Sequence, residues 1–436
     1  MNFLTFSQNS ESIGNEMHNL MKELFPICRS ITGNGVRDTL KILQTHIPIS
    51  VYEIPSETKV FDWKIPKEWN IHDAYVIDPK GKKIIDFKKS NLHVVSYSIP
   101  IHKKMSLSEL KPHLHTIPEI PDAIPYRTSY YDEDWGFCMK YNDFQKLEDG
   151  EYEIMIDSSL ENGFLTYGEF FKQGELKDEF LISCYICHPS MCNDNLSGTV
   201  LATFLAKILQ KIKTKFSYRI LFIPETIGAI TWLFENEKNL NLIKYGLVAT
   251  CLGDSGTLTY KKTRDGNHDI DKISEYILEQ SNQKYTVLDF FPIGSDERQF
   301  CSPGFNLPVG SLVRTGYGQF SEYHTSKDDL NFVKANFLAD TFSKYCQIIN
   351  LVENNEKYIN LNPKCEPQLG KRNLWNSLGG QRTAYGEKNA SAIFWILNQS
   401  DGTKTLLDIA IKSKIDFNVL KTIADNLVKQ NLLKLS

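Results

Sequence analysis

The stretch CHPSMCNDNLSG, residues 187–198, stands between the apolar run FLISCYI (180–186) and the stretch VLATFLAKIL (200–209). The first run is short and continuous, which is typical of a strand buried on both faces. The second repeats its apolar side chains at helical spacing. His188 and Asp194 therefore lie in a short turn from a buried strand to a helix. In an open parallel sheet, ligands bind at such turns, beyond the carboxyl ends of the strands.

The same alternation of apolar strand and helix continues along the chain. Further apolar runs occupy 218–224, 246–253 and 306–313, with helical stretches between them, and residues 11–46 read as an additional helical segment. Buried strands that alternate with helices predict a parallel sheet covered on both faces. We therefore expect an α/β fold, with a mixed, largely parallel sheet flanked by helices, built from residues 1–50 and 150–360.

Two other segments have different sequence patterns. Residues 51–149 contain short alternating runs such as DAYVID between prolines, which predicts a mostly β module inserted into the α/β domain. Residues 364–436 contain three short amphipathic helices, a capping box from Thr405 to Asp408, and the final LLKLS as a strand. That order predicts a winged helix-turn-helix domain.

Composition excludes several classes of protein. The chain has 436 residues, 41% of them hydrophobic, and a net charge of −4, which gives no reason to expect nucleic acid or an anionic membrane as the main partner. Residues 371–436 are basic, with ten Lys and Arg against five Asp and Glu. No leader peptide or membrane span is visible. Nine cysteines without a repeated spacing suit a reducing compartment, and we expect a cytoplasmic protein.

Ionisable side chains follow the ends of several predicted strands. They are His188 and Asp194 after the first, Glu225 after the second, Asp254 after the third, and His324 late in the chain. Imidazole and carboxylate together suit Zn²⁺, and three protein ligands with an open position mark a catalytic site. A carboxylate that is not a ligand can act as general base, and Glu225 is our choice for that role. Each of these residues taken singly is more typical of a helix cap or a solvated loop, and only the whole set favours a site.

A thiolate site is a weaker interpretation of the same turn. Cys187 and Cys192 flank His188, but no C-x-x-C pair lies nearby. Cys187 would also point away from His188 if the strand alternation continues. Two further side chains, Arg314 and Tyr317, precede His324 and are predicted substrate contacts, although residues of a surface loop would look the same.

The order of these motifs resembles the co-catalytic di-zinc aminopeptidase superfamily, which includes the glutaminyl cyclases. The motifs are His188-x5-Asp194-Asn-Leu-Ser-Gly-Thr, Pro-Glu225-Thr-Ile-Gly, Asp254, Ser-Asp296 and Tyr-His324-Thr-x-x-Asp328-Asp. With the inserted β module and the winged helix, the chain is similar to an uncharacterised bacterial aminopeptidase-like family often found among surface-polysaccharide genes.

The resemblance implies a phosphorylase/hydrolase-like zinc peptidase fold and a role for each motif residue. Asp194 would bridge two metals, with His188 and Asp254 completing one site and His324 contributing to the other. Glu225 would activate the metal-bound water, and Tyr323, the aromatic before His324, would line the substrate pocket. Two adjacent acidic residues are usual at the Glu225 position, the second being a ligand, but here the second is Thr226. The cofactor is therefore expected to be one or two Zn²⁺ ions.

We accordingly expect a zinc-dependent amide hydrolase that acts on a small peptide or on an amino-acyl or acylamino sugar. Two alternatives stay open: a single-metal acyl transferase or cyclase, and a non-catalytic sensor of a metal or ligand that signals through the winged helix. We expect a homo-oligomer and no membrane partner. Nucleic acid is a less favoured partner, because the last helix offers lysines and no arginine.

Overall fold

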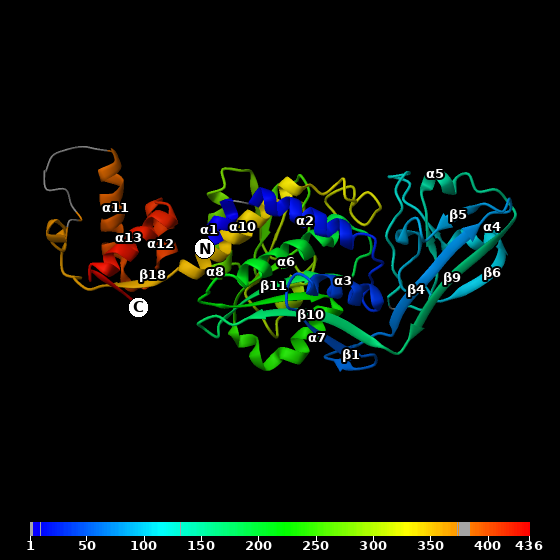
Figure 1. Cartoon of the computed structure of the whole chain (residues 1–436), viewed down its shortest axis with the longest axis horizontal. Coiled ribbons are helices and arrows are strands. Elements are labelled where there is room, and N and C mark those ends of the chain that lie inside the picture. The colour runs from blue at the N-terminus through cyan, green and yellow to red at the C-terminus, as the bar shows by residue number, and fades with distance from the viewer. Residues whose placement is uncertain (1–2, 9, 131, 373, 375–383) are drawn as a thin grey trace. The chain divides into compact units, whose positions relative to one another are not determined.

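A computed structural model describes residues 3–8, 10–130, 132–372, 374 and 384–436 (Figure 1). The chain divides into two compact units, Met1–Cys346 and Gln347–Ser436.

An eight-stranded mixed sheet forms the centre of the first unit. Its strand order is β1-β10-β12-β11-β13-β16-β14-β15. The four strands β12, β11, β13 and β16 run parallel. On one side β10 pairs antiparallel with β12, and β1 pairs antiparallel with β10. On the other side β14 pairs antiparallel with β16, and β15 pairs parallel with β14. The bounds are β1 Ser50–Pro55, β10 Phe164–Lys172, β11 Glu179–Tyr185, β12 Ser217–Ile223, β13 Ile243–Ala249, β14 Leu258–Lys261, β15 Tyr285–Leu288 and β16 Val309–Val313.

Helices cover both faces of this sheet, as expected for buried parallel strands. Helix α6 packs on one face with α2 outside it, and α7 lies on the other face (Figure 1). In α6 every residue except Lys207 is buried, which explains why its sequence is apolar on all sides. The bounds are α1 Phe3–Gln8, α2 Ser10–Leu24, α3 Asn34–Gln44, α6 Ser197–Leu209, α7 Ile227–Asn236, α8 Asp269–Glu279, α9 Glu297–Phe300 and α10 Ala335–Asn354, the last of which crosses into the second unit. The predicted α/β fold is confirmed.

The segment between β1 and β10 forms a second, smaller sheet with its own hydrophobic core. Its strand order is β5-β4-β9-β6, with bounds β4 Glu68–Ile77, β5 Lys83–Asp86, β6 Ile101–Ser106 and β9 Glu151–Glu161. Two short pairs, β2 Lys59–Val60 with β3 Trp63–Lys64 and β7 Leu114–His115 with β8 Phe137–Cys138, and the short helices α4 Leu107–Leu110 and α5 Tyr141–Phe144 complete it. Strand β9, which the sequence assigned to the α/β part, alternates buried and exposed residues and pairs with both β4 and β6.

The second unit has the winged helix-turn-helix order expected from the sequence. Helices α11 Ala384–Gln399, α12 Leu406–Ser413 and α13 Phe417–Lys429 accompany a sheet of order β18-β17-β19, with β17 Lys357–Asn360, β18 Asp401–Thr405 and β19 Leu433–Leu435. The predicted capping box is present: Thr405 Oγ1 accepts from the Asp408 N–H, and the Asp408 carboxylate accepts from the Thr405 N–H. The exact borders of the three predicted parts stay a prediction. Within the described residues, we find no helix with the length and apolar character that crossing a bilayer demands.

Candidate metal centre

The turn that follows β11 is held in place by one buried carboxylate. Asp328 accepts the backbone N–H of Asn193 at 2.6 Å and that of Asp194 at 2.9 Å. Its own backbone carbonyl accepts the N–H of Cys192. Because three backbone N–H groups of the turn donate to Asp328, the turn that carries the Asp194 side chain is held in place before any ligand binds.

Three of the side chains expected to bind metal converge at this turn. One donor atom each of His188, Asp194 and His324 lies within 4.8 Å of the others. His324 Nε2 lies 3.0 Å from Asp194 Oδ2, and the other carboxylate oxygen of Asp194 accepts a hydrogen bond from the Tyr185 hydroxyl. His188 and Asp194 come from the first strand end, whereas His324 comes from a loop 130 residues later. Two imidazoles and one carboxylate are a donor set that suits Zn²⁺.

The protonation states of these groups suit a cation. Burial lowers the pKa of His188 to about 4, so its imidazole is neutral and free to donate a lone pair. Burial alone would raise the pKa of Asp194, but His188 and His324 outweigh that effect and lower it to about 2. The residues present therefore fit a divalent ion, which requires deprotonated ligands.

Glu225 lies beside this group without joining it. One carboxylate oxygen, Oε2, is 3.9 Å from His188 Nε2, and the other accepts a hydrogen bond from Ser295 Oγ at 2.9 Å. Burial, together with the nearby Asp296 and Asp194, raises the pKa of Glu225 well above its ordinary value. A carboxylate with a raised pKa beside a metal site has the properties of a general base.

The next residue, Thr226, is turned away from the three donors. Its backbone is in the left-handed region, with φ of 63°. Its N–H donates to Asp296 Oδ1 at 2.7 Å, and its hydroxyl accepts from the Arg298 guanidinium at 2.9 Å. The position where a second acidic ligand was expected thus presents a hydroxyl that already accepts a hydrogen bond from a guanidinium.

Asp254 does not join the three donors either. It lies beyond the end of β13, and its carboxylate accepts hydrogen bonds from the Asn193 amide, the Gly256 N–H and the Thr315 hydroxyl. The loop that follows β13 therefore directs this carboxylate towards neighbouring loops. The geometry gives no support to Asp254 as a ligand, and it shows an orienting contact to Asn193, next to Asp194.

The three expected substrate contacts lie in different environments. Tyr323 stacks on the His324 ring at a centroid distance of 4.0 Å, so it borders the centre directly. Tyr317 lies beside Gly294 and Ser311, close to the segment that carries Ser295. Arg314 is buried, and its guanidinium pairs with Asp340 at 2.9 Å. Its charge is therefore used inside the fold, which gives no support to a substrate contact.

Two cysteines near the turn behave as buried apolar residues. The thiol of Cys187 accepts the Glu225 N–H, and burial raises its pKa well above the ordinary value. Burial does the same for the pKa of Cys192. Neither belongs to the converging group, but Cys187 Sγ lies 3.8 Å from His188 Nδ1, so the expectation that Cys187 points away from His188 is wrong.

One contact to the centre comes from the inserted segment and was not predicted. The ring of Tyr126 packs against both imidazoles, at centroid distances of 5.3 Å from His188 and 5.2 Å from His324. Its backbone N–H donates to the His324 carbonyl at 2.8 Å, and its hydroxyl pairs with that of Tyr130. Tyr126 therefore fixes the separation of two predicted ligands, although nothing in the local sequence PYRTSYY indicates this role.

Comparison with known proteins identifies the family. Residues 18–355 match the model of a domain of unknown function, DUF4910, and residues 356–435 match a winged helix-turn-helix model. The chain belongs to the DUF4910 family. A protein of Clostridium acetobutylicum, provisionally described as a polysaccharide biosynthesis protein with an aminopeptidase-like domain, is 58% identical over 99% of this chain and 98% of its own length.

Solved structures agree on the fold. A crystal structure of a provisionally named peptidase from Clostridium acetobutylicum superposes with a TM-score of 0.94 at 57% identity, over 99% of both chains. A zinc aminopeptidase from Bacillus subtilis superposes with a TM-score of 0.57 at 12% identity, over 79% of this chain and 95% of that one. The predicted resemblance to the zinc aminopeptidase fold is confirmed.

Proposed function

We propose that the protein is a zinc-dependent amide hydrolase with a single-ion centre formed by His188, Asp194 and His324. The observation that carries the proposal is the convergence of these three donors within 4.8 Å, with the Glu225 carboxylate 3.9 Å from His188. Three protein ligands leave a fourth position open for water and substrate, which is the arrangement of catalytic zinc sites.

The chain's own residues supply the proton transfers. A bound Zn²⁺ would polarise the scissile carbonyl and make water more acidic. Glu225 takes a proton from the attacking water and returns it to the leaving amine, since its raised pKa suits both steps. Ser295 donates to Glu225 Oε1 and leaves Oε2 facing His188. Tyr323, stacked on His324, borders the space for substrate.

We propose as substrate an amide with an unblocked amino group nearby, in a small peptide or in an amino-acyl or acylamino sugar. The aminopeptidase fold supports an amide with an unblocked amino group nearby, and the description of the Clostridium relative supports a sugar. A single-metal acyl transfer or cyclisation is the alternative reaction at the same residues, and it would differ by having an amine rather than water as nucleophile.

The Glu225→Gln variant tests the proposal. It should retain the metal content of the wild type, because Glu225 is not among the converging donors, while kcat falls by about 10²- to 10⁴-fold, as expected for loss of a general base. Turnover is measured on aminoacyl p-nitroanilides and on an amino-acyl glucosamine. Glu237→Gln, an exposed glutamate after α7, is the matched control and should behave as wild type. An active Glu225→Gln enzyme would contradict the role of Glu225.

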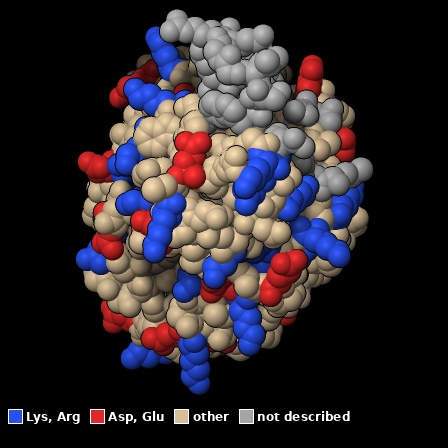
Figure 2. Space-filling model, turned by 90° about the vertical axis from the view of Figure 1, so that its left-hand side faces the viewer, with Lys and Arg blue, Asp and Glu red and all other residues tan. Residues whose placement is uncertain are grey.

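A second candidate function is nucleic-acid binding by the C-terminal unit, favoured by the match of residues 356–435 to the winged helix-turn-helix model. The excess of Lys and Arg in residues 371–436 suits such a partner, but the placement of these charges argues against it. Lys421 on α13 is paired with Asp425, and basic and acidic side chains are interspersed in Figure 2. A specific DNA complex that persists at physiological salt in a gel-shift assay would support this candidate; its absence would leave the unit as a docking or assembly module.

A further inference from the structure

The two carboxylate oxygens of Asp194 have different surroundings. Oδ1 accepts a hydrogen bond from the Tyr185 hydroxyl. Oδ2 is buried and accepts no hydrogen bond from any residue that the structure describes, although His324 Nε2 lies 3.0 Å away. One oxygen is therefore satisfied by the protein, and the other keeps its lone pairs for a cation.

The Tyr185 hydroxyl acts as the donor in this contact. An ionised carboxylate only accepts hydrogen bonds, so the phenol proton is directed at Asp194. The phenol oxygen also lies 2.6 Å from Thr250 Oγ1, which must then be the donor to it. A chain of two hydrogen bonds thus runs from Thr250 through Tyr185 to Asp194 Oδ1.

Both hydroxyl groups are placed by the central sheet. Tyr185 is the last residue of β11, and Thr250 directly follows β13, the parallel neighbour of β11; both side chains are buried. Asn195 Nδ2 donates to the carbonyl oxygens of Tyr185 and Ala249, at 3.3 and 3.0 Å, so the end of the turn is tied to the same two strands. The phenol therefore contacts Asp194 from a rigid part of the fold.

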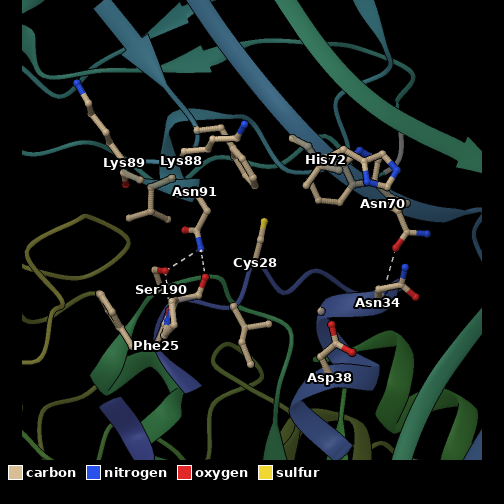
Figure 3. A pocket seen from close by; sticks show the side chains of 18 of the residues that line it. Phe25, Cys28, Asn34, Asp38, Asn70, His72, Lys88, Lys89, Asn91 and Ser190 are labelled. Carbon is tan, nitrogen blue, oxygen red and sulfur yellow. Dashed lines mark hydrogen bonds between the residues drawn. The ribbon is translucent and has the colours of Figure 1, made fainter. Parts of the chain in front are cut away.

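The backbone of the turn is held by contacts that do not involve the Asp194 side chain. At its start, Ser190 Oγ donates to the Phe25 carbonyl and accepts from Asn91 Nδ2, each at 2.7 Å (Figure 3). These three residues line a hollow of about 680 Å³, and none of the three converging metal donors lines it. Such contacts fix where the turn lies. The rotation of the Asp194 carboxylate is set instead by the hydrogen bond from Tyr185.

A second buried tyrosine shows what a purely structural contact of this kind looks like. The Tyr260 hydroxyl donates to Asp271 Oδ1 at 2.8 Å. Asp271 Oδ1 also accepts from the Thr263 N–H, and its Oδ2 accepts from the Thr263 hydroxyl and the His268 N–H. Both oxygens of Asp271 are thus satisfied by the protein. Asp194 differs because its second oxygen is left open.

We propose that Tyr185 is a positioning residue of the metal centre, which keeps Asp194 a ligand through Oδ2 alone. The proposal rests on the single-ion centre proposed above and deepens it. A carboxylate that bridges two ions gives one oxygen to each, and a carboxylate that rotates freely can give both oxygens to one ion. Because Oδ1 is bound to the phenol, either arrangement would cost that hydrogen bond. Tyr185 therefore favours one ion, held by one oxygen of Asp194.

The Tyr185→Phe variant tests this role, because it keeps the ring and removes only the hydroxyl. Zinc affinity, measured by titration against a competing chelator, should fall by about 10- to 100-fold, as for other groups that orient a metal ligand. Cobalt bound in place of zinc gives a second readout. The freed Oδ1 should raise the coordination number of the cobalt ion, which weakens its visible absorption. Tyr260→Phe, which takes a similarly buried hydroxyl from another carboxylate, should change neither readout.

The Thr250→Val variant tests the same chain of hydrogen bonds with a milder change. It removes the donor to the phenol but keeps the bond from Tyr185 to Asp194, so zinc affinity should fall by only about threefold. If Tyr185→Phe does not fold, unchanged zinc affinity in Thr250→Val overturns the role of Tyr185.

The outcomes separate this role from the proposed function. If the wild type binds zinc and a folded Tyr185→Phe protein keeps its affinity and cobalt spectrum, the role of Tyr185 alone is wrong. Equal changes in Tyr260→Phe would also overturn it, because the effect would then be one of general stability. A wild-type protein that binds no zinc would overturn the single-ion centre, and this role with it.

Discussion

The two sides of the metal centre differ in what their side chains are free to do. On the Asp194 side, the Asp194 carboxylate faces His324. The backbone N–H groups of the surrounding turn donate to the Asp328 carboxylate, which holds the turn in place. On the Thr226 side, the hydroxyl accepts from Arg298 and the N–H donates to Asp296. Both positions directly follow parallel strands of one sheet. Only the first offers a group with lone pairs directed at the other donors.

We infer from this difference that only one of the two metal positions implied by the sequence resemblance has its donor groups in place. A ligand must be negatively charged or neutral, and its lone pairs must not already be used. Asp194 meets both conditions, whereas Thr226 fails the second, because a hydroxyl that accepts from a guanidinium has little left to offer a metal ion. The comparison therefore predicts one ion rather than two.

The largest effect is expected from Asp194→Ala. It removes the carboxylate that faces His324 and leaves two imidazoles, so metal affinity should fall by more than the roughly 100-fold that loss of an outer contact causes. Metal content after dialysis and amide hydrolysis should both drop to background. Asp62→Ala serves as the matched control and should keep both. Metal retained in a folded Asp194→Ala protein would remove Asp194 from the site.

A smaller effect is expected from Asp328→Asn. The substitution keeps the size of the side chain but brings an amide NH₂ towards the N–H of Asn193 or Asp194, so one of these bonds is lost. Metal affinity should fall by about 10- to 100-fold, as for other groups that orient a ligand. A zinc titration against a competing chelator measures it. Unchanged affinity would mean that the turn holds its shape without Asp328.

The smallest change is expected on the other side of the centre. Thr226→Glu alone should leave the metal content unchanged, because Arg298 would pair with the new carboxylate. In the double variant with Arg298→Ala, the carboxylate loses that partner and the content should rise towards two ions. A second ion in the Thr226→Glu variant would show that Arg298 does not control this position. If neither variant binds a second ion, the charge at position 226 is not what limits the second site.

The sequence predicted the sheet and the positions of His188, Asp194 and Glu225 for one physical reason. Apolar strands are recognisable, and parallel strands bring the residues after their carboxyl ends to one edge. The orientation of Arg314 could not be predicted in this way. Its strand, β16, was recognised, but the pairing with Asp340 depends on how α10 packs against the sheet.

The contribution of Tyr126 also could not be predicted from the sequence. It lies in the inserted segment, 62 residues before His188, and its ring reaches both imidazoles only because that segment folds back onto the His324 loop. Asp254 shows the opposite case. Its place after a strand was recognised, but the loop after β13 turns its carboxylate to Asn193 and Thr315. Strand ends are thus predictable, whereas longer loops are set by tertiary contacts.

The most direct test of the single-ion centre is the number of zinc ions bound per chain, measured by elemental analysis of wild-type protein purified without chelators and then equilibrated with excess zinc and desalted. We predict one ion per chain, lost in Asp194→Ala. Two ions per chain in the wild type would contradict the account, because they would show that the side of the centre at Thr226 and Arg298 binds metal after all.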